Sequence, residues 1–468
     1  MISFSISYSQ VSNEIIDSKV NQSDLKKYIN ILSSDSLNGR MTGTLGQKKA
    51  AKFIAKEFKR LNLATKNNNS YFEKFPLNKT FLNKIYIKSL TKDYLNFREL
   101  IYIGNPINNE IEKEIIFAGY GTEKELLQIS DFTDKIVVIF TDNLRGFNIA
   151  LEKKLIDKKA YALILANPKS ENQFLSMQRT MKDFFLKKKF YFGEQKKDKE
   201  SKFLNRFIFK NESLESLFNI SIKKLLKASK TSKLNKIPTI KVRLKCERIT
   251  EKIETENVIG IIKGNTNKSI LISAHYDHLG EYGKSYYPGA DDNASGISAL
   301  LEIAEVFSCQ NLKYNIIILA TSGEEVGLLG SYFHSINENF NSNDIILNLN
   351  LDMISRTDDK HKKKDYYIYS IGTDINPIFK NLFTQVDSNY HKSYFDYSLD
   401  KSKSLTGVYH LSDQYSFYKK GIPSIMLFSG LHSDYHKITD TADKIDYKLL
   451  EYRIELINRV INEIQEKI

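Results

Sequence analysis

Cysteine is scarce in this sequence. Only Cys246 and Cys309 occur among its 468 residues, and neither has a second cysteine at the short spacing that cysteine-based zinc motifs require. A cysteine zinc site and a framework of several disulfides are therefore excluded, whereas a single bridge is left open. Long apolar runs are also missing. No run approaches the ~20 residues that span a bilayer as a helix, so the sequence predicts no transmembrane segment.

Acidic residues are fewer than basic ones, 56 against 69, and the formal net charge is +13. An excess of positive charge can indicate nucleic-acid binding, but the lysines are spread along the chain and form no arginine-rich patch. The densest basic stretch, Leu186–Lys210, contains interleaved Phe and Tyr residues, which could bind RNA. We favour a lysine-rich surface segment, and we predict no specific nucleic-acid partner.

The length predicts more than one domain, because single cores stop growing at roughly 250–300 residues. We divide the sequence into an N-terminal tail (1–20), an N-terminal helical part of the main domain (21–85), an inserted β-rich domain with a basic, irregular segment (86–250) and the C-terminal catalytic part (251–468). The start, MISFSISYSQ, is similar to the end of a secretory signal without its charged front. It predicts export to the periplasm, cell surface or medium, and a cytoplasmic location stays open.

Helical patterns come first along the chain, and strand patterns follow. Apolar residues recur at helical spacing in NQSDLKKYINILS, where Ser23 is the expected cap, and again from Ala50 to Leu61. From Asn257 onward, helical patterns alternate with the apolar runs SILISAH, NIIILAT, DIILNLNLD and GIPSIMLF. Such runs are typical of strands buried on both faces. The sequence therefore predicts an α/β fold with a mixed, largely parallel central sheet flanked by helices.

Acidic and histidine side chains follow these four runs. Six of them stand at the expected carboxyl ends of the strands or in the loops that leave them: His275, Asp292, Glu324, Glu325, Asp352 and His436. In an open α/β sheet the loops at that edge converge on one crevice, where ligands bind. We therefore expect these residues, far apart in sequence, to be neighbours.

Five of these residues predict a metal site. Three carboxylates packed together would repel one another and could not all stay ionised without a cation. Oxygen and nitrogen donors suit zinc, with manganese or cobalt as alternatives. Five donors exceed the four of one tetrahedral zinc, and two ions that share one carboxylate would use them all. The predicted ligands are His275, Asp292, Glu325, Asp352 and His436.

Two further acids are candidates for other roles. Glu324 and Glu325 are adjacent, so their side chains diverge, and Glu324 is expected to face bound water as a general base and acid. Asp277 comes two residues after His275 and would point to the same side of an extended backbone. There it could hold the second imidazole nitrogen of His275.

The remaining polar residues of these stretches have simpler interpretations. Asp291 and Asn293 suit a tight turn. His278 is left either as a supporting contact of the site or as a loop hydrogen bond. The other histidines are expected to be surface or structural residues: His334, His361, His391, His410 and His432.

Five motifs, AHYDHLG, GADDNASG, SGEEVGLLGS, LNLDM and YHKITDTADKIDY, occur in the order and spacing of the M28 family of zinc-dependent exopeptidases. The sequence resembles its aminopeptidase Y and bacterial leucyl-aminopeptidase group over Asn257–Ile468, and residues 32–63 resemble the family's N-terminal helices. The inserted part, with EIIFAGYGTE and DKIVVIF, is similar to the protease-associated domain of many members. The resemblance implies a phosphorylase/hydrolase-like zinc-exopeptidase fold.

The resemblance also implies residue roles. Asp292 would bridge two zinc ions, with His275 and Asp352 on one ion and Glu325 and His436 on the other. Glu324 would be the general base and acid, Asp277 would orient His275, and Tyr435 would help to stabilise the oxyanion. Gln414 stands where many relatives have a histidine, which puts local substrate contacts in doubt.

The implied reaction is the release of N-terminal amino acids from peptides or proteins. A glutamate-carboxypeptidase-like enzyme, a glutaminyl cyclase with one zinc, and a non-catalytic peptide-binding relative are the alternatives. The full set of five ligands favours two metal ions and hydrolysis. Side-chain specificity and oligomeric state stay open.

Overall fold

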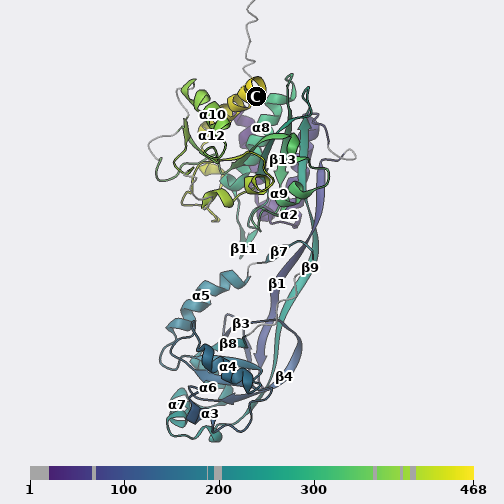
Figure 1. The fold of residues 1–468 in the computed structure, drawn as a ribbon. Helices are drawn as coiled ribbons and strands as arrows, with labels where there is room; N and C mark the ends of the chain where they lie inside the picture. The colour runs from purple at the N-terminus through teal and green to yellow at the C-terminus, as the bar shows by residue number, and fades with distance from the viewer. Residues whose placement is uncertain are drawn as a thin grey trace, which may run out of the picture. The chain divides into compact units, whose positions relative to one another are not determined.

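The computed structural model describes residues 20–65, 70–186, 188–193, 203–361, 366–389, 394–400 and 407–468. The chain forms two compact units: unit 1 comprises Met1–Pro76 and Glu254–Ile468, and unit 2 comprises Leu77–Ile253. The chain enters unit 2 within strand β1 (Phe72–Lys88) and returns within β9 (Ile240–Ile262) (Figure 1). The N-terminal tail up to residue 19, His391 and part of the basic stretch 186–210 lie outside the described residues.

Unit 1 is built on a mixed, largely parallel sheet with the strand order β16-β15-β17-β14-β10-β13-β9. Four neighbouring pairs are parallel, and the pairs β15/β17 and β13/β9 are antiparallel. This confirms the fold class predicted from the apolar runs. The strands are β10 (Ser269–His275), β13 (Asn315–Thr321), β14 (Ile345–Asp352), β15 (Tyr367–Ile371), β16 (Tyr394–Asp396) and β17 (Ser424–Phe428), with a small hairpin of β11 (Glu281–Tyr282) and β12 (Ser285–Tyr286).

Helices cover both faces of this sheet. Alternate side chains of β10 serve two cores: Ile270 and Ile272 pack with one group of helices, and Leu271 packs on the opposite face with Phe417. The first group is α1 (Gln22–Leu32), α2 (Leu45–Arg60), α8 (Gly296–Ser308), α10 (Pro377–Asn389) and α12 (Tyr447–Lys467), and the opposite face carries α9 (Leu329–Ile336) and α11 (Gln414–Tyr418).

The cap of α1 differs from the prediction. Asn21, not Ser23, is the N-cap, and its side-chain oxygen accepts a hydrogen bond of 2.9 Å from the Ser23 N–H. Ser23 lies inside the first turn, where its own amide is one of the free donors that a cap satisfies. The apolar face of the helix is as expected, with Leu25, Tyr28 and Leu32 buried.

One buried arginine ties the C-terminal helix to the sheet. Arg453 of α12 donates from Nε to the Tyr367 carbonyl (2.7 Å) and from Nη1 to the carbonyls of Ile354 and Arg356 (both 2.8 Å). These carbonyls belong to β15 and to the segment after β14. Arg453 therefore links α12 by hydrogen bonds to β15 and to the segment that follows Asp352.

In unit 2 the strand order continues from β9, and helices lie on both faces of this part of the sheet. Its strand order is β9-β4-β5-β6-β8-β3, with parallel pairing from β4 to β8. Helices α6 and α7 pack on one face, and α3, α4 and α5 contribute to the core of the other. The elements are β2 (Asp93–Leu95), β3 (Leu100–Ile103), β4 (Ile107–Phe117), α3 (Glu123–Leu126), β5 (Ile136–Phe140), α4 (Ile149–Asp157), β6 (Ala162–Ala166), α5 (Asn172–Leu186), β7 (Lys189–Tyr191), β8 (Asn205–Phe209), α6 (Asn211–Phe218) and α7 (Ile222–Lys230).

The region from Ser170 to Glu251, expected to be irregular, is largely regular where it is described. It contains α5, α6, α7 and much of β9. Its many lysines lie on the outer faces of elements whose inner faces are apolar, so the charge obscured the periodicity. The resemblance of this unit to a protease-associated domain stays a prediction.

Both cysteines are free thiols, buried at Cys246 and exposed at Cys309, so the bridge left open by the sequence is not formed. Among the described residues, no helix combines the length and the apolar character that crossing a bilayer needs.

Candidate metal-binding active site

The predicted site residues come from the carboxyl ends of parallel strands in unit 1. β10 ends at His275 and β14 ends at Asp352, and the turn after β13 carries Glu324 and Glu325. β10 runs parallel to β13 and β14, and β14 runs parallel to β17. All four strands therefore end at one edge of the sheet, as the sequence predicts.

Asp292 occupies the centre of the cluster. Its Oδ1 atom lies 3.4 Å from Nε2 of His275, and its Oδ2 atom lies 3.2 Å from Nε2 of His436. Asp352 Oδ1 lies 3.4 Å from the same His275 nitrogen, and Glu325 Oε2 lies 3.4 Å from the same His436 nitrogen. One carboxylate thus faces two separate histidine–carboxylate pairs, one through each oxygen.

These spacings fit metal ligands. Two atoms bound to one tetrahedral zinc ion, with bonds of about 2.0–2.1 Å, lie roughly 3.4 Å apart. The four nitrogen–oxygen distances around Asp292 are 3.2–3.4 Å, which match this spacing and lie at or beyond the long end of the hydrogen-bond range. Donors that converge without bonding one another are what an ion-binding site requires.

The charges of the cluster favour a bound cation. Burial raises the pKa of Glu324 well above its ordinary value, and Glu325 and Asp352 add to this rise. Burial acts to lower the pKa of His275, but Glu324, Asp352 and Asp292 raise it well above the ordinary value. Burial also opposes the shift at His436, yet its neighbours Asp292 and Glu325 raise the pKa to about 10. Without a metal ion, protons must balance the excess of acids.

Glu324 lies beside the ligand set rather than within its tightest contacts. Its Oε2 atom is 3.9 Å from Nε2 of His275, although it is near enough to His275 and Asp352 that all three could touch one ion. Its backbone N–H donates to Oδ1 of Asp277 (3.2 Å). The side chain is one-tenth exposed, so part of it is accessible to solvent.

Asp277 supports the site in a different way from the one predicted. The Nδ1 atom of His275 lies 3.2 Å from the backbone carbonyl of Asp277, not from its carboxylate. The carboxylate instead accepts hydrogen bonds from Thr42 Oγ1 (2.7 Å) and from the Glu324 N–H. The expected side-chain contact fails because β10 ends at His275 and the backbone beyond it is no longer extended.

Tyr435 and His436 form a stacked pair in the loop after β17. Their ring centroids are 3.8 Å apart with an interplanar angle of 23°. Burial and the carboxylates of Asp292 and Glu325 raise the pKa of Tyr435, so its hydroxyl stays protonated. His436 has a φ of 54°, a strained value for a non-glycine residue that is often found at functional sites.

The loop that carries His436 is anchored to the Asp292 turn, η3 (Ala290–Ser295). The carboxylate of Asp440 accepts from the backbone N–H groups of Asp291 (3.1 Å) and Asp292 (3.1 Å). Asp291 Oδ1 accepts from the N–H (2.9 Å) and hydroxyl (2.6 Å) of Ser355, and its Oδ2 lies 3.1 Å from Nε2 of His432. No motif of the sequence predicts a role for Asp440, because it acts through backbone amides.

Arg40 connects the N-terminal helical part to both ligand-bearing loops. It is fully buried, and it donates from Nε to the Tyr276 carbonyl (2.9 Å) and from Nη2 to the Gly289 carbonyl (3.0 Å). It thereby holds the backbone beside His275 and beside Asp292. Gly289 has a φ of 58°, and any side chain there would collide with the His278 ring.

His278 belongs to the site. It is buried, and its Nδ1 atom lies 2.6 Å from Oε1 of Glu325 and 3.8 Å from Oδ2 of Asp292. His278, Asp292 and Glu325 are close enough to share one ion. The short contact with Glu325 is a hydrogen bond, so the structure favours the supporting contact over the simple loop interpretation.

Other predicted residues lie away from this centre. His334 contacts Glu73, and His361 lies between Asp358 and Asp396, so both are structural. Gln414 accepts from Asn350 Nδ2 (3.0 Å) and donates to the Tyr409 carbonyl (2.6 Å). Among the described residues it has no contact with the ligand set.

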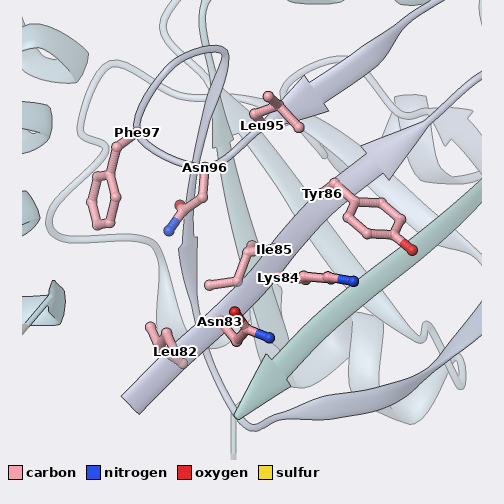
Figure 2. A pocket seen from close by; sticks show the side chains of 8 residues that line it. All are labelled: Leu82, Asn83, Lys84, Ile85, Tyr86, Leu95, Asn96 and Phe97. Carbon is pink, nitrogen blue, oxygen red and sulfur yellow. The ribbon is translucent and has the colours of Figure 1, made fainter. Parts of the chain in front are cut away.

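A surface hollow of about 330 Å³ lies in unit 2 and is separate in sequence from these residues (Figure 2). Its lining residues are Leu82, Asn83, Lys84, Ile85, Tyr86, Leu95, Asn96 and Phe97. Figure 2 shows Lys84 and Tyr86 on one side of β1 and Ile85 on the other. The lining contains no acid or histidine, so it offers no metal-binding group of that kind.

Residues 257–461 match the model of peptidase family M28. Aminopeptidase YwaD of Bacillus subtilis is 29% identical over 224 residues, which cover 46% of this chain and 45% of that protein. The uncharacterized protein YfbL of Escherichia coli is 28% identical over 206 residues, or 38% of this chain and 62% of that protein. The chain thus matches less than two thirds of the length of these relatives.

Two solved structures share the fold. The aminopeptidase from Aneurinibacillus sp. strain AM-1 aligns with a TM-score of 0.53 at 20% identity, covering 95% of this chain and 94% of that one. The zinc aminopeptidase from Bacillus subtilis aligns with a TM-score of 0.52 at 20% identity, covering 96% of each. Together with the sheet and its motifs, these findings show that residues 257–461 of unit 1 form a domain of peptidase family M28.

Proposed function

We propose that this chain is a two-zinc aminopeptidase that releases N-terminal amino acids from peptides. One observation carries the proposal: the two oxygens of Asp292 face two separate histidine–carboxylate pairs at ligand spacing. His275 and Asp352 would hold one ion, Glu325 and His436 would hold the other, and Asp292 would bridge them. Manganese or cobalt could replace zinc in such a donor set.

Bound zinc would supply a Lewis acid for the scissile carbonyl and would make water a stronger acid near neutral pH. Glu324 takes the proton of the attacking water and returns it to the departing amine, because its carboxylate lies beside the ligands without sharing their short contacts. The Tyr435 hydroxyl, kept protonated by its surroundings, donates a hydrogen bond to the oxyanion.

The N-terminal direction of cleavage is supported by the similarity of this chain to aminopeptidase YwaD of Bacillus subtilis. A carboxypeptidase of the same fold would need a cation to receive the substrate carboxylate. Arg40, which contacts the backbone beside His275 and Asp292, is fully buried with its donors committed to backbone carbonyls, so it does not supply that cation.

The test compares wild type with Glu324→Gln. The wild type should bind two zinc ions per chain and cleave aminoacyl chromogenic substrates, while N-acetylated versions of the same peptides should be resistant. The variant should keep both ions and lose roughly 10²–10⁴-fold in kcat. Equal cleavage of blocked and free peptides would refute the aminopeptidase assignment, and undiminished kcat in the variant would refute the role of Glu324. One zinc ion per chain would favour the cyclase-like alternative.

A further inference from the structure

The positive charge of this chain is concentrated in unit 2. The sequence from Leu77 to Ile253 contains 36 lysines and arginines against 21 aspartates and glutamates, whereas the sequence of unit 1 contains 33 against 35. The excess charge of the whole chain therefore belongs to the inserted unit. This segregation is independent of the peptidase site, which lies in unit 1.

Within unit 2, one segment contains most of that excess. Between Glu215 and Glu247 the sequence has nine lysines and arginines and no acidic residue. The segment includes α7 and the turn that follows it. It also has no aromatic residue after Phe218.

Six lysines of this segment form an exposed surface, here called the α7 lysine patch. All six side chains are exposed, and among the described residues none of them forms an ion pair with a carboxylate. The patch consists of Lys223, Lys224, Lys227 and Lys230 on α7 and of Lys233 and Lys236 just after it.

The packing of α7 leaves its lysine side chains facing the solvent. The opposite side of α7 is buried: Ile222 and Leu225 belong to the core on one face of the unit 2 sheet, and Ala228 is buried beside them on the helix. Ser221 caps the helix by accepting from the Lys224 N–H, and α7 is labelled at the periphery of unit 2 beside α6 (Figure 1). The nearby acids are engaged elsewhere: Glu215 accepts from the Ile222 N–H, and Glu125 is bonded to Ser229.

The chemistry of the patch selects its partner. Lysine ammonium groups are point charges without the two-pronged geometry by which arginine recognises individual phosphates or bases. The patch has no aromatic side chain on which a nucleic-acid base could stack. Because the apolar side of α7 is committed to the core, the helix cannot insert into a bilayer as an amphipathic anchor.

We propose that the α7 lysine patch binds the surface of anionic lipid membranes by charge alone. Each lysine near an anionic bilayer adds a favourable contribution that fades within a Debye length, so several together give salt-sensitive, reversible attachment. Attachment through unit 2 would hold the chain at a membrane surface without any membrane-spanning element.

The experiment measures co-sedimentation of the full chain with phosphatidylcholine vesicles, with and without phosphatidylglycerol, at low and at physiological salt. Wild type should bind only the anionic vesicles, and binding should weaken as salt rises. The triple variant Lys223→Gln, Lys227→Gln, Lys230→Gln should lose roughly 100-fold in partition coefficient. Its peptidase activity and melting temperature should equal those of wild type.

The matched control is Lys52→Gln, Lys56→Gln, Lys59→Gln. These three exposed lysines lie on α2 of unit 1 with the same i, i+4, i+7 spacing and the same total charge. The control should bind vesicles as wild type does. An equal loss in both variants would reduce the effect to net charge and overturn the proposal. Binding to DNA duplexes but not to anionic vesicles, or equal binding to neutral vesicles, would overturn it as well.

Discussion

At the scale of single residues, two histidines approach the same carboxylate with different geometry. His278 lies 2.6 Å from Oε1 of Glu325 and is buried, whereas His436 lies 3.4 Å from Oε2 and has about a third of its side chain exposed. The shorter contact is a hydrogen bond, and the longer one has the spacing of two ligands on one ion. A metal site needs both kinds of residue, because the hydrogen-bonded one orients the ligand.

We therefore expect the two histidines to differ under substitution. His436→Ala should lower the zinc content from two ions to one per chain after dialysis, because a ligand is removed. His278→Ala should retain two ions with the affinity of one of them weakened by roughly 10–100-fold. Metal analysis and competition with a coloured chelator measure both. If only His278→Ala lost an ion, His278 would be the ligand and His436 the supporting residue.

A residue far from this chemistry makes stability depend on pH. Burial raises the pKa of Glu302 on α8 to about 7, and nearby Asp24 and Glu305 add to the shift, while the Asn21 N–H that donates to it (2.8 Å) opposes it. The folded chain thus binds this proton more tightly than the unfolded chain. The resulting stability is fully present below the ordinary pKa of 4.5 and is lost as pH rises through about 7.

Glu302→Gln should remove this pH dependence. At about pH 8 the variant should be more stable than wild type by roughly 1–2 kcal/mol, and at about pH 4, below the unfolded pKa, the difference should vanish. Urea unfolding at the two pH values gives the comparison. Glu305→Gln is the control, since Glu305 is an exposed residue on the same helix that pairs with Arg60 and should change stability by less than about 1 kcal/mol. A variant that is less stable than wild type at the higher pH would contradict the assignment.

At the scale of elements, the C-terminal helix depends on one buried side chain. Arg453 satisfies the backbone carbonyls of Tyr367, Ile354 and Arg356. Arg453→Met keeps the apolar stem and leaves these carbonyls without a donor. We expect the free energy of unfolding to fall by about 3 kcal/mol or more, measured by denaturant titration. Arg459→Met, at an exposed position of the same helix, should lower the free energy of unfolding by less than about 1 kcal/mol. An equal loss in both variants would show that the hydrogen bonds of Arg453 are not what stabilises this helix.

The elements also show what a sequence can and cannot predict. The strand ends of unit 1 follow from continuous apolar runs, and because parallel strands share an edge, the cluster around Asp292 follows too. Periodicity was equally present in α7, where Ile222, Leu225 and Ala228 are buried, but dense lysines hid it. Side-chain direction beyond a strand end is set by local backbone turns, so the carboxylate of Asp277 could not be placed.

Supporting residues are harder still to predict, because their partners are backbone groups. Arg40 contacts carbonyls that lie more than two hundred residues further along the chain, and Asp440 accepts from the amides of Asp291 and Asp292. Because nearly every residue has the same backbone donor and acceptor, no sequence pattern predicts such contacts.

At the scale of the whole molecule, each unit has hydrophobic cores of its own. The cores of unit 1 and those of unit 2 share no residue, and the candidate metal ligands all lie in unit 1. Zinc should therefore stabilise one unit alone. Calorimetry should show two transitions, of which only one moves upward by the equivalent of about 2.7 kcal/mol when zinc is a hundredfold above its Kd.

Asp292→Asn is the matching control for this experiment, because it weakens the shared ligand while leaving unit 2 untouched. Neither of its two transitions should respond to zinc. If zinc moved both transitions of the wild type together, unfolding of the two units would have to be coupled, which would contradict their independence.

The discontinuity of unit 1 has a consequence for how the protein is made. Residues of α1 and α2 are synthesised before unit 2, yet their apolar faces pack against β-strands and helices that are encoded after residue 254. Unit 2 is continuous in sequence. It can therefore fold before the partners of α1 and α2 have been synthesised. During synthesis the nascent chain therefore exposes side chains such as Tyr28 and Phe58 for the time needed to translate the whole insertion, the period when chaperones are most needed.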